Sequence, residues 1–184
     1  MVIGDRGSRF AVRGSRFAVR CERLRLEVGS CELEADTMKS IFNPRDHIGL
    51  HDRIQQLKTT SQAHWGRMTA LQMVAHLSDS LRMASGELEV APKKVPFRFS
   101  PLKELVLYVL PVPKGVPTSP ELIARKPGDW SVEVAALREQ LNGLVERGAE
   151  ALAPVHPAFG KMSAKQWGVL IYRHMDHHLR QFGV

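Results

Sequence analysis

The chain has 184 residues, of which 43% are hydrophobic and 24% are charged, and its formal net charge is +7. This length suits one domain with a substantial core, and a second full domain is not expected. The positive charge attracts anions, but lysine and arginine are scattered along the chain and no nucleic-acid-binding motif accompanies them. Nucleic-acid binding is therefore not expected.

Cysteine usage indicates a reducing compartment, and the apolar stretches indicate neither a membrane span nor a secretory signal. The sequence has 2 cysteines, Cys21 and Cys31, and lacks cysteine from Met38 onward, which argues against a disulfide framework. The most apolar stretch, residues 105–112, is far shorter than the roughly 20 residues that a membrane-spanning helix needs. Residues 1–20 carry arginines throughout and no continuous apolar core, unlike a secretory signal. We therefore expect a cytoplasmic protein without a membrane span.

The first 37 residues differ from the rest of the chain. The heptapeptide GSRFAVR occurs twice in succession, at residues 7–13 and 14–20, and this period is too short for a solenoid repeat. We expect residues 1–37 to be a poorly ordered extension. The hypothesis is that the folded domain spans residues 38–184 and that translation can also start at Met38.

Two helices are predicted in the first half of this domain. Residues 44–60 carry apolar side chains at near-helical spacing, and Asn43 is placed to cap the helix that they form. Thr69 and Gln72 form a capping-box pattern at the start of a second helix, which Gly86 ends.

A long proline-rich segment separates the second helix from the third. Residues 87–130 contain eight prolines, so we expect an irregular connection with one short helix over residues 101–110. A connection of this length inside a compact domain is typical of a functional segment, such as a wall or lid over a site. Helical spacing returns over residues 131–152, with Ser131 as the expected cap and Gly148 near the end.

The last helix begins at a second capping-box pattern, Ser163 with Gln166, and continues to Gly183. No strand pattern or hairpin turn is evident from residue 38 onward. The expected fold class is therefore all-α, with four principal helices in one bundle and a long irregular connection between the second and third.

The last helix carries three histidines within the sequence YRHMDHHLRQFGV. His174 and His178 are four residues apart, so they share a helical face, have Cβ atoms about 6 Å apart and can converge on one ion. Core residues lie on the same face, and a buried imidazole needs a partner, such as a metal, for its ring nitrogens. His177 lies about 100° round the helix from His178, so we expect it to be exposed to solvent or at an interface.

His76 in the second helix supplies a third ligand if that helix packs beside the last one. Three imidazoles without a fourth protein ligand are typical of a catalytic metal site, whose open position holds water or a substrate thiol. Asp176 is expected to point away from the ion, and Asp79 is either an outer partner of His76 or a surface carboxylate. Three further histidines do not fit this pattern and are expected to have no role: His47, His51 and His64.

At these residues the chain resembles the DinB-like superfamily of metal-dependent enzymes, and within it a subfamily of unknown function. The likeness rests on three stretches in the same order: WGRMTALQMVAHLSDSLRMA at 65–84, HPAFG at 156–160 and QWGVLIYRHMDHHLRQFG at 166–183. The resemblance implies a DinB-like four-helix bundle. It also implies a divalent metal ion, zinc or nickel before others, held by His76, His174 and His178.

Members of that superfamily include transferases that activate a low-molecular-weight thiol, such as bacillithiol or mycothiol, and thiol-dependent isomerases. The resemblance therefore implies a metal-dependent transferase or hydrolase in which a thiol or water reacts with a small electrophilic substrate. A homodimer is a further expectation. The alternative is a non-catalytic metal-binding or stress-related helical bundle, because no general base can be assigned from the sequence. The catalytic residues stay open.

Overall fold

The computed structural model describes residues 38–115 and 117–184. This part of the chain is mostly helical, as the sequence predicts, and it also contains one two-stranded sheet. Residues 38–184 form one compact unit by their internal contacts. The heptapeptide repeat and the extension predicted over residues 1–37 lie outside the described residues.

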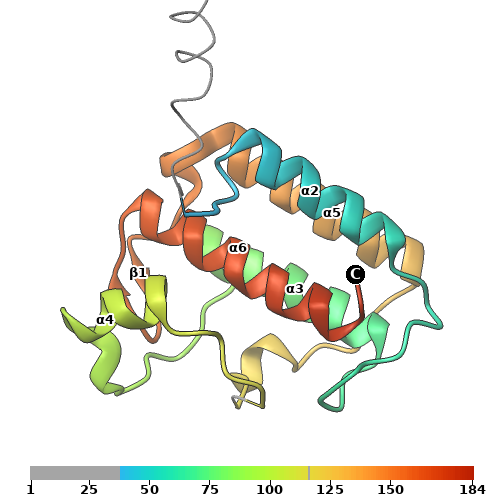
Figure 1. The fold of residues 1–184 in the computed structure, drawn as a ribbon, viewed down its shortest axis with the longest axis horizontal. Helices are drawn as coiled ribbons and strands as arrows, with labels where there is room; N and C mark the ends of the chain where they lie inside the picture. The colour runs from blue at the N-terminus through green and yellow to red at the C-terminus, as the bar shows by residue number, and fades with distance from the viewer. Residues whose placement is uncertain (1–37, 116) are drawn as a thin grey trace, which may run out of the picture. The chain divides into compact units, whose positions relative to one another are not determined.

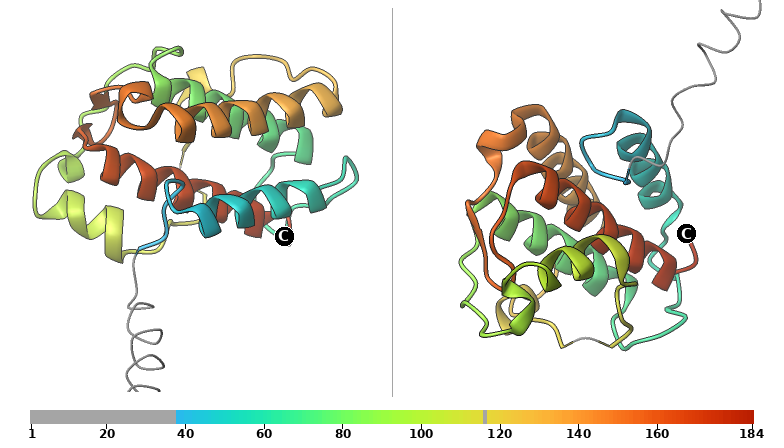
Figure 2. Two further views of the ribbon diagram at one scale, coloured as in Figure 1. Left: turned by 90° about the horizontal axis from the view of Figure 1, so that it is seen from above. Right: turned by 60° about the vertical axis from the view of Figure 1, so that its left-hand side comes forward.

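Four long helices in the described residues surround the core: α2 (Pro44–Gln56), α3 (Ala70–Ser85), α5 (Trp130–Arg147) and α6 (Ala164–Gln181). Helix α3 packs against both α5 and α6, and α2 packs against α6. Figures 1 and 2 show α3 and α6 running side by side through the middle of this unit. Helices that are distant in sequence, α3 and α6, are therefore neighbours in space.

Three of the predicted helix caps are confirmed. The side chain of Asn43 accepts backbone N–H groups in the first turn of α2. Thr69 and Ser163 both form complete capping boxes, at the starts of α3 and α6. Because such caps satisfy N–H groups that have no partner inside the helix, they fix where α3 and α6 begin.

Two helix boundaries differ from the prediction. Helix α5 begins one residue before Ser131, directly after Asp129, so the expectation that Ser131 caps this helix is wrong. The carboxylate of Glu133 accepts the N–H of Gly128 instead, which ties the helix start to the preceding loop. Helix α2 ends at residue 56 rather than 60, because Leu57 adopts an extended conformation in which its side chain is buried.

In its described residues, 87–115 and 117–130, the proline-rich connection contains four short helical pieces: η1 (Pro96–Arg98), α4 (Leu102–Glu104), η2 (Leu105–Val109) and η3 (Pro120–Leu122). Together α4 and η2 match the short helix predicted over residues 101–110. The guanidinium of Arg173 on α6 donates to the backbone oxygens of Leu107 and Leu110. These hydrogen bonds hold the end of η2 against α6.

A small hairpin precedes α6, so the expectation of no strand is wrong at this point. After the short helix η4 (Gly148–Ala151), β1 (Val155–His156) pairs antiparallel with β2 (Gly160–Lys161). Each strand has two residues, too few to show the alternating pattern by which a strand is recognised in sequence. The hairpin places the HPAFG sequence in a tight turn beside the start of α6.

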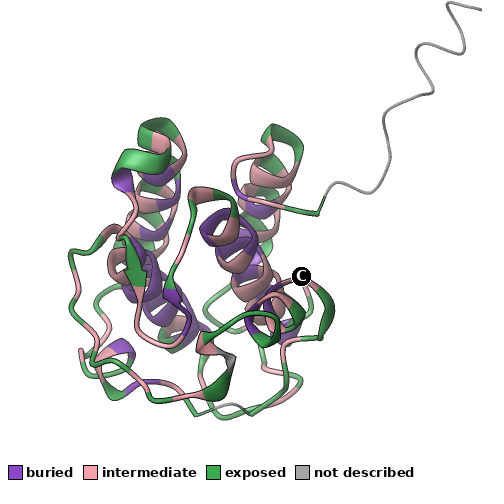
Figure 3. Cartoon of the chain, turned by 90° about the vertical axis from the view of Figure 1, so that its left-hand side faces the viewer, coloured by how far each residue is buried: buried purple, intermediate pink, exposed green. Residues whose placement is uncertain are grey.

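The core lies between the four long helices, whose facing sides are buried in Figure 3. Its largest fully buried side chains include Leu50, Ile54, Met73, Leu77, Leu137, Leu141, Trp167, Met175 and Leu179. The indole N–H of Trp167 donates to the backbone oxygen of Ala153 at 2.8 Å, so this large buried ring has a polar partner. No helix in the described ranges is long and apolar enough to cross a membrane.

Candidate metal centre

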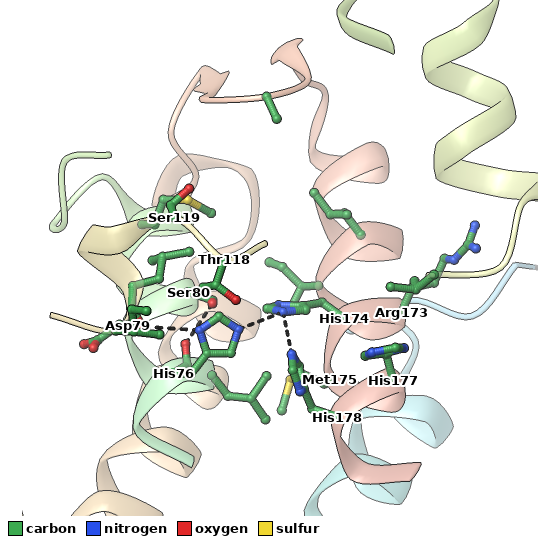
Figure 4. Close-up of a pocket in the computed structure, with 18 of the residues that line it drawn as sticks. His76, Asp79, Ser80, Thr118, Ser119, Arg173, His174, Met175, His177 and His178 are labelled. Carbon is green, nitrogen blue, oxygen red and sulfur yellow. Dashed lines mark hydrogen bonds between the residues drawn. The ribbon is translucent and has the colours of Figure 1, made fainter. Parts of the chain in front are cut away.

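Three histidines from two helices converge at one point, as Figure 4 shows. His76 lies on α3, and His174 and His178 lie one turn apart on α6. The Nε2 atom of His174 is 3.1 Å from Nε2 of His76 and 3.1 Å from Nε2 of His178. Within residues 38–115 and 117–184 this is the one group of three or more histidine, cysteine or acidic side chains whose ligand atoms lie within 4.8 Å of one another.

The outer ring nitrogens of two of these histidines are bound to hydrogen-bond acceptors. Nδ1 of His76 lies 3.2 Å from the backbone oxygen of Leu122, and Nδ1 of His178 lies 2.8 Å from Oε1 of Gln181. Because these oxygens only accept, each Nδ1 carries the proton and each Nε2 presents a lone pair. If His174 carries its proton on Nε2, it can donate that proton to the Nε2 lone pair of either His76 or His178, but not of both. At least one converging lone pair therefore has no proton donor within the cluster.

This geometry fits a divalent metal ion. For metal–nitrogen bonds of about 2.1 Å, neighbouring ligand nitrogens lie about 3.0–3.4 Å apart in octahedral or tetrahedral coordination. The observed separations of 3.1 Å fall in that range. A cation would also satisfy the lone pair that lacks a donor. His76, His174 and His178 can therefore hold a metal ion, and imidazole ligands suit zinc and nickel among others.

Burial keeps these three imidazoles neutral. It lowers the pKa of His76, and together with the neighbouring His76 it lowers the pKa of His178 to about 4. The pKa of His174 is well below its usual range because of burial and, secondarily, because of the two neighbouring rings. The neutral imidazole is the form that binds metal, so the cluster is ready to bind an ion at neutral pH.

Gln181 fixes the ring of His178 and also anchors the loop before α3. Its side-chain amide nitrogen donates to the backbone oxygen of Trp65 at 2.6 Å, which orients Oε1 toward His178. At the next residue, Gly66, φ is +82° and an added Cβ would lie 2.5 Å from that amide nitrogen. Only glycine fits there without displacing Gln181. The side chain of Gln181 therefore holds both the loop before α3 and the ring of His178 in place.

The expectation that Asp79 is a surface carboxylate is wrong. Asp79 makes no hydrogen bond to His76, whose Nδ1 binds Leu122, although its charge partly offsets the effect of burial on the pKa of His76. It is 2% exposed, and it accepts a hydrogen bond from Nε of Arg125 at 2.8 Å. Arg125 also binds Glu133 of α5 at 2.5 and 2.7 Å. The bond to Glu133 raises the pKa of Arg125, and the same contact lowers the pKa of Glu133. This network could not be found from spacing, because Arg125 lies in the irregular connection.

Two neighbours of the ligands on α6 point elsewhere. Asp176 binds Arg53 of α2 at 2.7 Å and Arg180 at 2.8 Å, in agreement with a side chain turned away from the cluster. His177 is half-buried rather than exposed, and its ring meets that of Trp65 edge-on with centroids 5.7 Å apart. The difference arises because the loop before α3 folds over this part of α6.

A second histidine pair lies on α2. His47 and His51 are also four residues apart, and their Nε2 atoms lie 3.2 Å from each other. The expectation that their spacing sets them apart from a ligand pair is therefore wrong. No third histidine, cysteine or acidic ligand joins them in the part of the chain that the structure describes. His64 contributes through its backbone, whose N–H donates to the oxygen of Gln181 at 2.8 Å.

The three-histidine cluster faces a cavity of about 1200 Å³. Helices α3 and α6, the proline-rich connection and the hairpin loop all contribute to its walls. Its apolar side chains include Leu107, Leu110, Leu122, Phe159, Trp167 and Leu170. Pockets that bind small molecules usually measure about 300–1,000 Å³, so this cavity has ample room for one. The connection is thus a wall of the cavity.

Residues 49–183 match the family described as "Protein of unknown function (DUF1569)". The chain belongs to this family. The matched region contains α3, the connection, α5 and all of α6, and with them all three clustered histidines. No curated protein and no solved structure matches the chain significantly.

Proposed function

We propose that this protein is a metal-dependent enzyme with a DinB-like four-helix bundle. In this proposal His76, His174 and His178 hold a divalent ion, zinc or nickel. The observation that carries it is the commitment of two Nδ1–H groups to Leu122 and Gln181, which leaves Nε2 lone pairs converging beside a large cavity. Three neutral imidazoles without a fourth protein ligand leave a position open for a reactant.

The chemistry divides between the ion and the chain. When bound, the ion lowers the pKa of a coordinated thiol or water, so that the anion is available at neutral pH. The chain holds the ligand rings in place through Leu122 and Gln181 and surrounds the reactant with apolar side chains. Asp79 is the only acidic residue of the described cavity wall, and it is bound to Arg125. The cavity thus offers orientation and apolar surface but no free carboxylate base.

The substrates we propose are a low-molecular-weight thiol, or water, and a small apolar electrophile. A cavity of about 1200 Å³ has room for two small molecules at once. Its walls beside the cluster are mostly apolar, which favours an uncharged reacting group and excludes bulk water from it. Transfer of the thiol to the electrophile, or hydrolysis of the electrophile, is the reaction class that suits this arrangement.

The test has two stages. Protein purified without an affinity tag should contain about one equivalent of zinc or nickel by mass spectrometry of the metal, and His174→Ala should contain none. The loaded protein is then assayed with cysteine, glutathione, bacillithiol and mycothiol against a panel of alkyl and aryl halides and epoxides. Turnover that is lost in His174→Ala supports the enzyme.

The non-catalytic alternative makes a different prediction in the same experiment. Stoichiometric metal without turnover of any thiol or of water favours a metal-binding bundle, which the lack of a free carboxylate in the cavity wall also allows. Absence of stoichiometric metal, or full metal content in His174→Ala, contradicts both forms of the proposal.

A further inference from the structure

His156, outside the three-histidine cluster, has a ring whose orientation and tautomer are fixed by its own turn. It ends β1, and its Nδ1 atom accepts the backbone N–H groups of Ala158 at 2.9 Å and Phe159 at 3.1 Å. Its ring also packs against those of Phe159 and Trp167, with centroids 5.0 and 5.1 Å apart. The ring therefore cannot rotate without breaking the hairpin turn.

Two backbone donors on Nδ1 determine where the proton of this imidazole lies. Because Nδ1 receives both N–H groups through its lone pair, the proton of the neutral ring is on Nε2. That Nε2–H makes no hydrogen bond to any residue in the described ranges. Among the described residues, the indole nitrogen of Trp65 is a fully buried polar atom without a hydrogen-bond partner, and Nε2 of His156 is not such an atom. Because Nε2 has no hydrogen-bond partner, it must be accessible to solvent or to a ligand. His156 is one of the residues that line the cavity, so the cavity is the space that we assign to this donor.

Two lysines, Lys93 and Lys103, place positive charge near this ring. The backbone N–H of Lys93 donates to the oxygen of Pro157 at 2.9 Å, and the side chain of Lys93 lines the same cavity. Lys103, which is buried, donates from Nζ to the backbone oxygen of Lys161 in β2. Burial first, and then the charges of Lys103 and Lys93, lower the pKa of His156 to about 4. His156 thus stays a neutral donor in a positive environment.

Most of the other charges on the cavity wall are also positive. Its described cations are Arg67, Lys93, Arg125 and Arg173, against the single carboxylate of Asp79. Arg125 is neutralised by Asp79 and Glu133. Lys93 has no carboxylate within 4.0 Å among the described residues, and the carboxylate of Glu121, whose charge acts with it, lies outside the cavity wall. A free N–H donor and a lysine ammonium at the edge of an apolar cavity are the groups that bind a carboxylate.

We propose that the Nε2–H of His156 and the ammonium of Lys93 bind the carboxylate of a substrate whose apolar body lies in the cavity and extends toward the three-histidine cluster. This inference rests on the proposed function, since it names the class of molecule that the same cavity accepts. Trp167, against which His156 packs, precedes His174 by seven residues, about 10 Å along α6. The substrate is therefore an apolar acid long enough to span that distance.

Binding of octanoate tests this assignment, with 1-octanol as the uncharged match. Isothermal titration is carried out on metal-free protein, so that no carboxylate can be bound by an ion, and is repeated with zinc. Octanoate should bind about tenfold more tightly than octanol in both forms, because the charge-assisted hydrogen bonds are available to the acid alone. Equal affinities, or no measurable binding of octanoate, overturn the inference.

The decisive variant is His156→Asn. Asparagine places Oδ1 where Nδ1 lies, so it can accept the N–H groups of Ala158 and Phe159 and keep the turn, but it has no group at the position of Nε2. His156→Asn and Lys93→Met should each lose most of the preference for octanoate while binding of octanol changes little, and circular dichroism checks that each variant is folded. His47→Asn, on α2 and outside the cavity wall, should keep the full preference.

The outcomes separate this inference from the proposed function. If octanoate is preferred only when zinc is present, the carboxylate binds at the ion and the assignment to His156 is overturned, while the proposed metal site stands. If His156→Asn keeps the preference, the assignment is likewise overturned. If the protein binds no metal but prefers octanoate through His156, the inference is supported and the proposed function is contradicted.

Discussion

Two histidine clusters in this molecule share the same local geometry and differ in nearly everything around it. His174 and His178 on α6 have Nε2 atoms 3.1 Å apart, and His47 and His51 on α2 have Nε2 atoms 3.2 Å apart. Both pairs use the spacing of four residues that brings side chains together on a helix. Only the pair on α6 meets a third histidine and a cavity.

The difference shows what the spacing leaves undecided. A metal site needs lone pairs directed at one point and, usually, acceptors that fix the protons on the far side of the rings. The cluster on α6 has such acceptors in Leu122, at 3.2 Å from His76, and in Gln181, at 2.8 Å from His178. Leu122 lies in the proline-rich connection, whose placement depends on the tertiary fold, whereas Gln181 lies on α6 itself, three residues after His178. The pair on α2 therefore serves as an internal control for the one on α6.

The largest effect is expected from His174→Ala. This substitution removes the nitrogen that lies 3.1 Å from both other rings, so zinc affinity should fall by more than about 100-fold. His51→Ala, which removes the equivalent member of the α2 pair, should leave zinc affinity unchanged. Titration in competition with a chromogenic chelator measures both. A comparable loss in the two variants would mean that the clusters are not distinct, and circular dichroism checks that each variant is folded.

Acid should distinguish the clusters next. In the metal-free protein, burial lowers the pKa of His178 to about 4, so protons compete with zinc for this ligand only at low pH. Zinc should stay bound as pH falls through 6.5, and half-release should occur nearer pH 4, as measured by metal content after desalting at each pH. Release centred near the ordinary histidine pKa of about 6.5 would indicate exposed ligands.

The same lowered pKa values predict the stability of the metal-free protein. Below about pH 6.5 the unfolded chain takes up protons on histidines that stay neutral in the folded protein. The free energy of unfolding should therefore fall between pH 6.5 and about 4, the pKa of His156 and His178 in the folded protein, and change less below it. Urea titrations at fixed intervals of pH measure this fall. A constant or rising stability over that interval would contradict burial of neutral imidazoles.

A smaller effect is expected at Gln181, the acceptor that fixes the ring of His178. Gln181→Leu removes the oxygen bound to Nδ1 of His178 and should weaken zinc binding by about tenfold, within the range typical of such outer partners. Gln181→Glu keeps an acceptor for His178 and should retain most of the zinc affinity, although it loses the bond to Trp65. If both variants bind zinc equally weakly, the role of Gln181 is to hold the loop and not to orient the ring.

The long helices could be predicted from the sequence, whereas the irregular connection and its contacts could not, and the reason is physical. Caps at Asn43, Thr69 and Ser163 and the apolar periodicity are local, so helix positions could be predicted from neighbouring residues. That His174 and His178 share one face of α6 could likewise be predicted, because they are four residues apart on a helix. Leu122, which binds His76, and Arg125, which binds Asp79 and Glu133, lie in the proline-rich connection. The path of this connection depends on contacts with α3 and α5. No spacing rule reaches across those contacts.

His156 illustrates the same limit at shorter range. Its sequence HPAFG stands out, but a two-residue strand on each side gives no periodicity from which the turn could be inferred. Its chemical role follows only from the two backbone N–H groups that the folded turn directs at Nδ1. The tautomer of a histidine is therefore a property of the fold, even where all the residues that determine it are adjacent in sequence.

The smallest effect on zinc affinity is expected at the ion pair that connects α2 to α6. Arg53 of α2, two residues after His51, binds Asp176 of α6 at 2.7 Å, and Asp176 lies between the two histidines of α6 in sequence. Because that carboxylate points away from the cluster, Arg53→Met should change zinc affinity by less than about twofold and lower the free energy of unfolding by about 1 kcal/mol. Arg180→Met removes the more exposed partner of Asp176 and should cost less stability still. Chelator competition and urea unfolding measure the two quantities on the same samples. A several-fold loss of zinc affinity in Arg53→Met, but not in Arg180→Met, would show that α2 positions the ligands on α6 and that the pair at His47 and His51 is not an independent control.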